Sequence, residues 1–304
     1  MLSSYPSIYT VGHKAVRDIL TGPVVIQEKV DGSQISFGVN NGSLHIRSKG
    51  AEIYQTAPDN MFKFGVEVIS FMAEKLTPGW TYRGEYLRVP RHNVLAYDRI
   101  PVNHIILFDV ETSLQDYLPY PELQVEAERL GFEAVPLLFD GEWNSDIDAF
   151  KGLLETKSIL GGVKVEGVVI KNYTMFGTDK KVLMAKYVSE DFKEIHSSVW
   201  GKSAKAHTNV VDSIIAGLRT PARWQKAVQH LQEAGLIEDS PKDIGLLFKE
   251  VPADLRKECS DDVKEMLFDH FWPKICRGST AGLAEWYKER LLKQQFKDNT
   301  VDAS

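Results

Sequence analysis

The sequence predicts an α+β protein, in which a domain of mixed, largely antiparallel sheets with flanking helices precedes a smaller all-helical domain. Strand-length apolar runs dominate residues 1–196, and apolar residues at helical spacing dominate residues 197–304. A length of 304 residues also fits two domains, at about 150 residues for each. We expect the boundary near residues 196–205, where a Gly-Lys-Ser run is typical of a linker.

Turn residues separate the predicted elements of the first domain. An Asn41-Gly42 pair between two alternating segments predicts a hairpin over residues 33–48, because these residues suit the tight turns of hairpins. Helical spacing of apolar residues over 61–76 ends at Pro78-Gly79. Further helices are predicted at 121–130 and 146–156, and further strands at 24–29, 80–87, 104–110, 134–139, 165–171 and 181–188.

The second domain has helical periodicity throughout. Prolines and glycines separate its segments, since proline disfavours a helix interior and glycine often ends a helix. The predicted helices cover residues 210–218, 222–233, 253–271 and 281–295.

Composition and charge limit the classes of function. An apolar fraction of 43% and a charged fraction of 26% exclude a disordered chain. With 36 basic and 42 acidic residues the net charge is −6, and residues 197–304 carry 16 of each sign, so the acid excess lies in the first domain. A nucleic-acid partner must therefore be held by a local basic surface and not by the overall charge.

Cysteine content and hydropathy indicate the compartment. Cys259 and Cys276 are too few for a disulfide framework, and we expect both to be reduced. The first residues lack the basic start and apolar stretch of a signal peptide, and no apolar run reaches the roughly 18–20 residues of a membrane span. We therefore expect a soluble, cytoplasmic protein without a membrane partner, in the host-cell cytoplasm if the source is viral. A monomer is compatible with the sequence, which leaves the oligomeric state open.

The segment Glu28-Lys29-Val30-Asp31-Gly32 carries the first chemical signal. A strand that leads into a glycine turn holds the stem of Lys29 and lets its amine face a pocket. A lysine amine is a nucleophile only when it is deprotonated, which burial or neighbouring cations favour. An isolated segment of this kind is more often an exposed hairpin turn, so the segments that follow decide its meaning.

Four further segments follow in order: Gly84-Glu85, Phe108-Asp109, Glu166 to Lys171, and Lys186. Together with the Lys29 segment they resemble five motifs of the covalent nucleotidyltransferase superfamily, which contains ATP-dependent ligases and mRNA capping enzymes. Each segment alone is unspecific, but five of them in the family's order over about 160 residues are a strong signal.

The resemblance implies a set of residues that act on phosphate. Lys29 would attack the α-phosphorus of ATP and become adenylylated, with Asp31 beside it in the same motif. Lys171 and Lys186 would neutralise the α-phosphate, which otherwise repels an approaching nucleophile. Arg47 occupies the place of an essential arginine of the family that contacts phosphate.

The resemblance also implies the residues that bind the nucleoside and the metal. Glu85 would accept a hydrogen bond from the ribose, and Phe108 would stack on adenine. The backbone of Glu28 would also contact adenine. Glu166 would bind Mg²⁺, or Mn²⁺ in its place, because Mg²⁺ favours one or two carboxylates with waters and phosphate oxygens.

The fifth motif departs from the family's pattern. Related ligases have two lysines one residue apart, and here Lys186 stands alone between Met184 and Val188. One phosphate-contacting cation is therefore missing or supplied from elsewhere. Candidates for it are Lys180, Lys181 and Arg88.

Helical periodicity after Lys186 favours one branch of the superfamily. DNA ligases and capping enzymes continue with a β-barrel, whereas the RNA ligase 2 family continues with a helical domain, and the chain resembles that family over about residues 5–195. The resemblance implies ATP-dependent joining of a 3′-hydroxyl to a 5′-phosphate in RNA, with nicked duplex RNA as the expected partner. The alternatives are a capping-type guanylyltransferase, a minimal DNA ligase and a catalytically inactive nucleic-acid-binding module.

The helical domain contains the most basic stretch of the chain, with two interleaved tryptophans. Two interpretations stay open: contact with an RNA phosphate backbone, or a solvated helix face over a core tryptophan. The residues are Lys202, Lys205, Arg219, Arg223 and Lys226, with Trp200 and Trp224.

Overall fold

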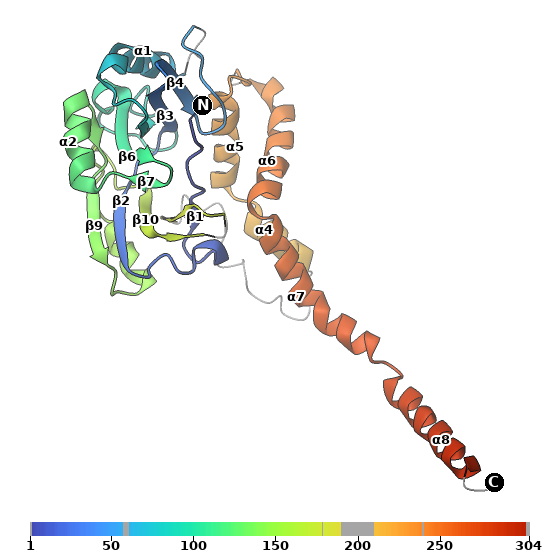
Figure 1. Ribbon diagram of the computed structural model, residues 1–304. Coiled ribbons are helices and arrows are strands. Elements are labelled where there is room, and N and C mark those ends of the chain that lie inside the picture. The colour runs from blue at the N-terminus through green and yellow to red at the C-terminus, as the bar shows by residue number, and fades with distance from the viewer. Residues whose placement is uncertain (1, 57–60, 178, 190–209, 239, 302–304) are drawn as a thin grey trace. The chain divides into compact units, whose positions relative to one another are not determined.

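The computed structural model combines sheets and helices, which confirms the α+β class (Figure 1). It describes residues 2–56, 61–177, 179–189, 210–238 and 240–301. These residues belong to two compact units, of which the first is Met1–Lys193 with Trp224–Phe248 and the second is Glu194–Arg223 with Lys249–Ser304. The boundary expected at 196–205 lies outside the described residues, so its position stays a prediction.

Five strands form the first sheet, in the order β1-β11-β10-β2-β9. Neighbouring strands are antiparallel except β1 and β11, which are parallel. The predicted strands at 24–29 and 181–188 are confirmed, and the one at 165–171 continues to Phe176. The strands are β1 (Tyr9–Thr10), β2 (Pro23–Lys29), β9 (Leu137–Glu142), β10 (Gly167–Phe176) and β11 (Val182–Val188).

The second sheet has the order β4-β3-β5-β6-β7, with β8 paired to β6. The predicted hairpin over 33–48 is confirmed, and Asn41 and Gly42 at its turn have φ angles of 51° and 74°. Two successive residues with positive φ are the requirement of a type I′ turn. The strands are β3 (Ser33–Asn40), β4 (Ser43–Ser48), β5 (Thr81–Tyr86), β6 (Ile105–Ser113), β7 (Asp116–Tyr117) and β8 (Glu133–Ala134).

Helices cover the outer face of each sheet. The helices α1 (Lys63–Met72) and α2 (Tyr120–Leu130) lie beside the second sheet (Figure 1). Their apolar residues share one core cluster with Phe37 of β3. Phe150 of α3 (Phe150–Leu153) packs on the first sheet. Short 3₁₀ helices are η1 (Lys14–Val16), η2 (Ala73–Lys75), η3 (Val102–His104), η4 (Ile147–Ala149) and η6 (Pro241–Asp243).

A third apolar cluster joins the inner faces of the two sheets. Its members include Val30, which follows β2, and Ile106 of β6, with Leu160 from the segment before β10. Because the helices cover the outer faces, the polar side chains on the inner faces are left to build a site beside this cluster.

Five helices follow the sheets in the described part of the chain: α4 (Val210–Leu218), α5 (Pro221–Glu233), α6 (Ile244–Glu258), α7 (Ser260–Ser279) and α8 (Leu283–Val301). The prediction of one helix over 253–271 is wrong. Helix α6 continues through Pro252, and the break between α6 and α7 falls at Cys259. A proline costs a helix one backbone hydrogen bond, but tertiary contacts can outweigh this. Asp254, just after the proline, is buried and forms an ion pair with Arg223.

Arg223 is therefore not part of an exposed basic surface. Its Nη1 lies 2.5 Å from Oδ2 of Asp254, and its side chain is fully buried. Trp224 is half exposed, so it is not a core tryptophan. The predicted residues Trp200, Lys202 and Lys205 lie outside the described part of the chain.

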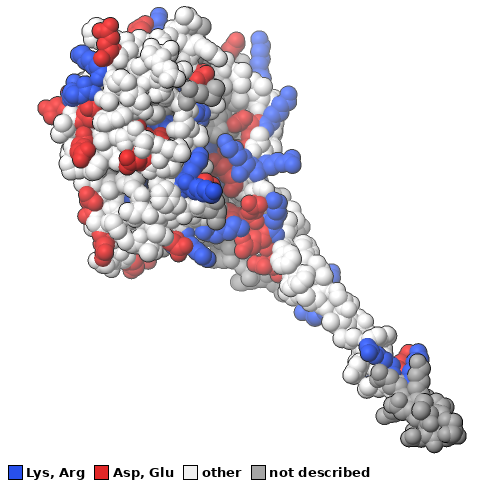
Figure 2. All heavy atoms as spheres, viewed as in Figure 1, with Lys and Arg blue, Asp and Glu red and all other residues white. Residues whose placement is uncertain are grey.

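The described surface mixes both signs of charge. Acidic and basic side chains lie side by side on the face of the molecule in Figure 2, as the small net charge suggests. Cys259 is buried and Cys276 exposed, and neither forms a disulfide. Among the described helices, none combines the length and the apolar composition that a membrane span requires.

Candidate active site

Three lysines project from the inner face of the first sheet. The strand register pairs Lys29 of β2 with Gly167 of β10, and Lys186 of β11 with Val169 of β10. Side chains alternate between the faces of a strand, so Gly167, Val169 and Lys171 share one face, and the residues between them join the outer core. Lys29, Lys171 and Lys186 are therefore brought to the same face.

Glu166, directly before β10, is the partner of Lys29. Its Oε2 lies 2.6 Å from Nζ of Lys29. The Glu166 side chain is 9% exposed, whereas that of Lys29 is 28% exposed. The expected nucleophile and the expected metal ligand are thus in direct contact.

The electrostatics of this pair favour a charged lysine. Burial alone would lower the pKa of Lys29, but the carboxylates of Glu166, Glu85 and Asp31 outweigh burial and raise that pKa. Burial raises the pKa of Glu85 to about 8, against the opposing charge of Lys29, and it raises the pKa of Glu166 in the same way. Lys29 is therefore held as an ammonium.

A β-bulge in β6 directs two consecutive residues to the inner face. The register pairs Arg83 of β5 with Asp109, but the next residue, Gly84, pairs with Leu107. Phe108 is therefore the extra residue of the bulge. The side chains of Phe108 and Asp109, which regular alternation would place on opposite faces, both face the first sheet.

Lys171 contacts both residues of the bulge. Its Nζ donates a hydrogen bond to the backbone O of Phe108 at 2.8 Å and lies 3.0 Å from Oδ2 of Asp109. The same Nζ lies 5.2 Å from the centroid of the Phe108 ring, within the range of a cation–π interaction. Burial lowers the pKa of Lys171, and the charge of Asp109 opposes this only in part. The expected adenine and phosphate contacts thus lie side by side.

The side chain of Asp31 accepts hydrogen bonds from the loop of residues 93–95. Its Oδ2 accepts hydrogen bonds from the backbone N–H groups of Val94 and Leu95, both at 2.8 Å, and its Oδ1 accepts one from Nδ2 of Asn93 at 3.3 Å. Its own backbone N–H donates to the hydroxyl of Tyr97 at 2.8 Å. The carboxylate is thereby engaged in loop geometry, which explains an aspartate at this position without a direct role in chemistry.

Two further expected site residues use their side chains elsewhere. The carboxylate of Glu28 accepts hydrogen bonds from the Ser158 hydroxyl at 2.5 Å and the Ile159 backbone N–H at 3.1 Å. The Glu28 side chain is therefore engaged by these two donors, and its backbone N–H donates to the backbone O of Pro136 at 3.2 Å, so a backbone contact with adenine stays an expectation. Nη1 of Arg47 donates to the backbone O of Leu2 at 3.0 Å, so the structure joins Arg47 to the start of the described chain.

Buried apolar side chains, Met184 and Val188, occupy both positions at which the fifth motif could have its second lysine. Met184 is buried and pairs with Lys171 across β11 and β10. A lysine in place of Met184 would lie beside Lys171, which is itself buried. Among the candidates for a compensating cation, Lys181 donates to the Ser4 hydroxyl at 3.3 Å.

A model of the RNA ligase family matches residues 22–188, which is more than half of the chain. The chain belongs to the RNA ligase family. The match starts immediately before β2 and ends with β11, so it contains the residues from Glu28 to Lys186 that define the site.

Solved structures similar to this RNA ligase family member include those of a Naegleria gruberi RNA ligase. The complex with PPi has 19% identity and a TM-score of 0.47, and the match covers 62% of this chain and 56% of that chain. A variant with ATP and Mn has 19% identity, a TM-score of 0.45, and coverage of 62% and 55%. This chain therefore matches little more than half of the length of those ligases. A search of curated protein sequences finds no relative.

Residues outside the family match also reach the site. Nε2 of Gln229 in α5 donates to the backbone O of Gly32 at 2.9 Å and to Oε1 of Glu233 at 2.9 Å. The charge of Glu233 contributes to the raised pKa of Glu85. A glutamine on an amphipathic helix carries no sequence motif, so only the tertiary structure could indicate these two residues.

The carboxylate of Glu166 suits a divalent cation that arrives with a nucleotide. Within the described residues, no group of three or more His, Cys, Asp or Glu side chains could hold a metal ion alone. Mg²⁺ commonly binds through one or two carboxylates, waters and substrate phosphates, which is compatible with Glu166 near the charges of Glu85 and Asp31.

Proposed function

We propose that this protein is an ATP-dependent RNA ligase that joins 3′-hydroxyl and 5′-phosphate ends through an adenylylated lysine. The observation that carries the proposal is the position of Lys29, which shares one sheet face with Lys171 and Lys186 and contacts Glu166. Nucleotidyl transfer needs a nucleophile surrounded by groups that neutralise the charge of the phosphate, and this arrangement supplies them.

In the first step, the deprotonated Nζ of Lys29 forms a bond to the α-phosphorus of ATP. The bond from that phosphorus to the bridging β-phosphate oxygen breaks, and pyrophosphate leaves with the electron pair. AMP remains on Lys29 as a phosphoramidate. Lys171 and Lys186 would hold the α-phosphate oxygens, so Lys171 has to exchange part of its contact with Asp109 for phosphate.

The charge on Glu166 determines when Lys29 can react. In the structure this carboxylate, at 2.6 Å, is foremost among the groups that keep the proton on Lys29. A divalent cation held by Glu166 and the phosphate oxygens would neutralise both the carboxylate and the α-phosphate. The amine could then lose its proton to solvent and reach the phosphorus.

The later steps transfer AMP to RNA. The 5′-phosphate of one RNA end displaces Lys29 from the AMP phosphorus, which leaves the 5′ end activated by AMP. The 3′-hydroxyl of the other end then attacks the activated 5′-phosphate, and AMP leaves. We propose nicked duplex RNA as the substrate, because its two ends are already held next to each other.

Labelling with ATP tests the first step. The protein is incubated with ATP radiolabelled on the α-phosphate and with Mg²⁺ or Mn²⁺, and the denatured chain is examined for bound label. Lys29→Ala is expected to take up none, whereas Lys151→Ala, which removes an exposed lysine paired with Asp148, keeps the label. Retention of the label by Lys29→Ala would overturn the assignment of the nucleophile.

A panel of substrates tests the later steps. Nicked RNA duplex, nicked DNA, RNA–DNA hybrids and single strands are compared under one salt concentration, because contacts to phosphate depend on salt. Sealing of nicked RNA in preference to DNA is the expected result. Labelling by GTP and not ATP would identify a guanylyltransferase, and absence of any label would identify an inactive binding module.

A further inference from the structure

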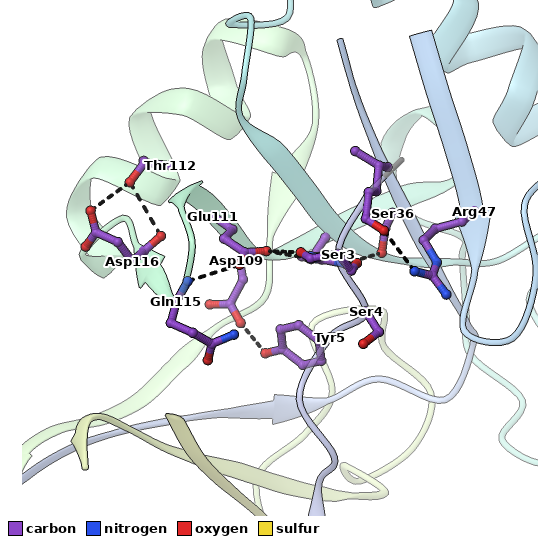
Figure 3. A network of polar contacts seen from close by, with 12 residues as sticks. Ser3, Ser4, Tyr5, Ser36, Arg47, Asp109, Glu111, Thr112, Gln115 and Asp116 are labelled. Carbon is purple, nitrogen blue, oxygen red and sulfur yellow. Dashed lines mark hydrogen bonds and ion pairs between the residues drawn. The ribbon is translucent and has the colours of Figure 1, made fainter. Parts of the chain in front are cut away.

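Residues Leu2–Tyr5, here named the leading segment, precede the family match and lie on the inner face of the second sheet (Figure 3). The strand register places Arg47, Ser36, Arg83 and Asp109 in one row across β4, β3, β5 and β6. The leading segment crosses the strands along this row, and it contacts three of the four residues in chain order.

Leu2 and Ser3 bind the two arginines of the row. The backbone O of Leu2 accepts a hydrogen bond from Arg47 at 3.0 Å, and that of Ser3 accepts one from Arg83 at 2.9 Å. The Ser3 hydroxyl accepts a second bond from Arg83 at 2.7 Å and donates to Glu111 at 2.9 Å. Arg83 and Glu111 are buried and lie 2.5 Å apart, so Ser3 supplies hydrogen bonds to charges that water cannot reach, whereas Nε of Arg83 has no hydrogen-bond partner within the described residues.

Tyr5 binds the acidic end of the row. Its hydroxyl donates to Oδ2 of Asp109, and the Tyr173 hydroxyl donates to Oδ1 at 2.5 Å. Nζ of Lys171 lies 3.0 Å from the same Oδ2 that Tyr5 contacts. Asp109 is 1% exposed, so two phenols and one ammonium surround a carboxylate that is removed from water.

Tyr5 also contacts Phe108, the other residue of the bulge. Its ring meets the Phe108 ring edge-on, with 5.2 Å between centroids and an angle of 62°. Edge-to-face contact fixes the orientation of two aromatic rings. Tyr5 therefore touches both Phe108 and Asp109, the two residues that Lys171 contacts from the first sheet.

We propose that the leading segment is a positioning element for adenylylation, and that Tyr5 is the positioning residue that sets Lys171 and Phe108 for the nucleotide. The inference rests on the proposed ligase function. Tyr5 shares Oδ2 of Asp109 with Lys171, so its hydroxyl limits how strongly the carboxylate holds the ammonium and fixes where the carboxylate lies. Buried hydrogen-bonded networks of this kind keep their members in one geometry.

Tyr5→Phe tests the proposal, because it keeps the ring and removes only the hydroxyl. Lysyl-AMP formation is measured as a function of ATP concentration, and the KM for ATP is expected to rise roughly tenfold with a smaller change in maximal rate. The reason is that Asp109 then relies on Lys171 alone at Oδ2 and withholds it from phosphate. A purely structural role would reduce the amount of active protein and leave the KM unchanged.

Two further variants make the test specific. Tyr173→Phe removes the other phenol from Asp109 and is expected to raise the KM in the same direction, with an effect that is not additive with Tyr5→Phe. Tyr120→Phe is the matched control, since that hydroxyl bonds to the backbone of Val135 and Leu137 away from Asp109, and its KM is expected to stay unchanged.

Binding of ATP gives a readout that does not need the reaction. In a Lys29→Ala background, Tyr5→Phe is expected to weaken ATP binding by roughly the same factor as the change in KM. If the wild type takes up label from ATP but Tyr5→Phe keeps the same KM and Kd for ATP, the inference about Tyr5 is overturned and the proposed function stands. Absence of both label and ATP binding in the wild type would overturn the proposed function and the inference with it.

Discussion

Lys29 and Glu166 form a close ion pair, with 2.6 Å between Nζ and Oε2. The carboxylate keeps the proton on the amine and raises its pKa, whereas burial alone would lower it. Since each unit of pKa changes the amount of neutral amine tenfold, the free protein holds Lys29 almost entirely as an ammonium. For the ligase function that we propose, a ligand that engages Glu166 would favour the reaction of Lys29.

Replacement of Glu166 is expected to release this restraint. In Glu166→Gln, acylation of Lys29 by an amine-selective reagent at pH 8 should be at least about tenfold faster than in the wild type, because the carboxylate that most raises the pKa of Lys29 is removed. The rate is measured without nucleotide, by mass spectrometry of the peptide that contains Lys29.

Glu155→Gln is the control for this labelling experiment. It removes the carboxylate partner of Lys164, but both side chains of that pair are more than 60% exposed. Exposed pairs interact weakly, so acylation of Lys164 should change little. Equal rates for Lys29 in Glu166→Gln and the wild type would show that Glu166 does not hold the proton.

Glu85 makes stability depend on pH. Its pKa is about 8 in the folded protein and 4.5 in a model peptide, so the folded state binds this proton more tightly. The stabilisation is complete below pH 4.5 and is lost as the pH rises through 8. Between pH 6.5 and 8, wild type should lose on the order of 1 kcal/mol of unfolding free energy relative to Glu85→Gln, as measured by urea unfolding.

His92 sets the lower limit of that pH window. Burial lowers its pKa to about 4 from 6.5, so its contribution to stability is lost as the pH falls from 6.5 to 4, opposite in sign to that of Glu85. Above about pH 7.5 the imidazole is neutral in both states, and at lower pH its slope is the same in wild type and in Glu85→Gln and cancels from their difference. A stability difference between Glu85→Gln and wild type that stays constant from pH 6.5 to 8 would refute the raised pKa.

The buried pair of Arg83 and Glu111 is expected to be costly to break. Either Arg83→Met or Glu111→Gln leaves a charge or a polar group without its partner, and the loss should be about 3–5 kcal/mol of unfolding free energy. In a double-mutant cycle, the variant with both substitutions should lose less unfolding free energy than the sum of the losses of the two single variants.

An exposed pair supplies the comparison for this cycle. Arg99 and Glu133 lie 2.7 Å apart, but the arginine is 42% exposed, so breaking this pair should cost about 1 kcal/mol or less. Similar losses for the two pairs would contradict the role of burial in the first.

Local chemistry explains which parts of the fold were predictable. The Asn41-Gly42 turn requires positive φ at both residues, and this requirement is visible in two letters of sequence. The bulge at Phe108 depends on how β5 and β6 align, which no short pattern encodes. The local preference of proline predicted a helix end at Pro252, but α6 continues through it, and the buried ion pair of Asp254 with Arg223 lies just beyond.

The same distinction holds for the candidate site. Lys29 and Glu166 were predictable because each lies in a short motif, and the structure brings them into contact. Tyr5 and Asp109 are 104 residues apart, and their hydrogen bond exists only because the leading segment crosses the second sheet. The sequence offered no signal for Gln229, whose contact with Gly32 spans 197 residues.

Gly167, the first residue of β10, directly follows Glu166. We expect that no side chain is tolerated at this position. A Cβ at this position would lie 2.6 Å from the backbone O of Tyr187 and 2.7 Å from Cγ1 of Val188, so the backbone would have to move. Gly167→Ala should therefore lose about 1–3 kcal/mol of unfolding free energy. Because the shift displaces Glu166 from Lys29, the variant should also form lysyl-AMP more slowly. Gly50→Ala, with nothing within 4 Å of the added Cβ, should stay within about 0.5 kcal/mol of wild type, and equal stability of both variants would contradict the close approach of β10 and β11.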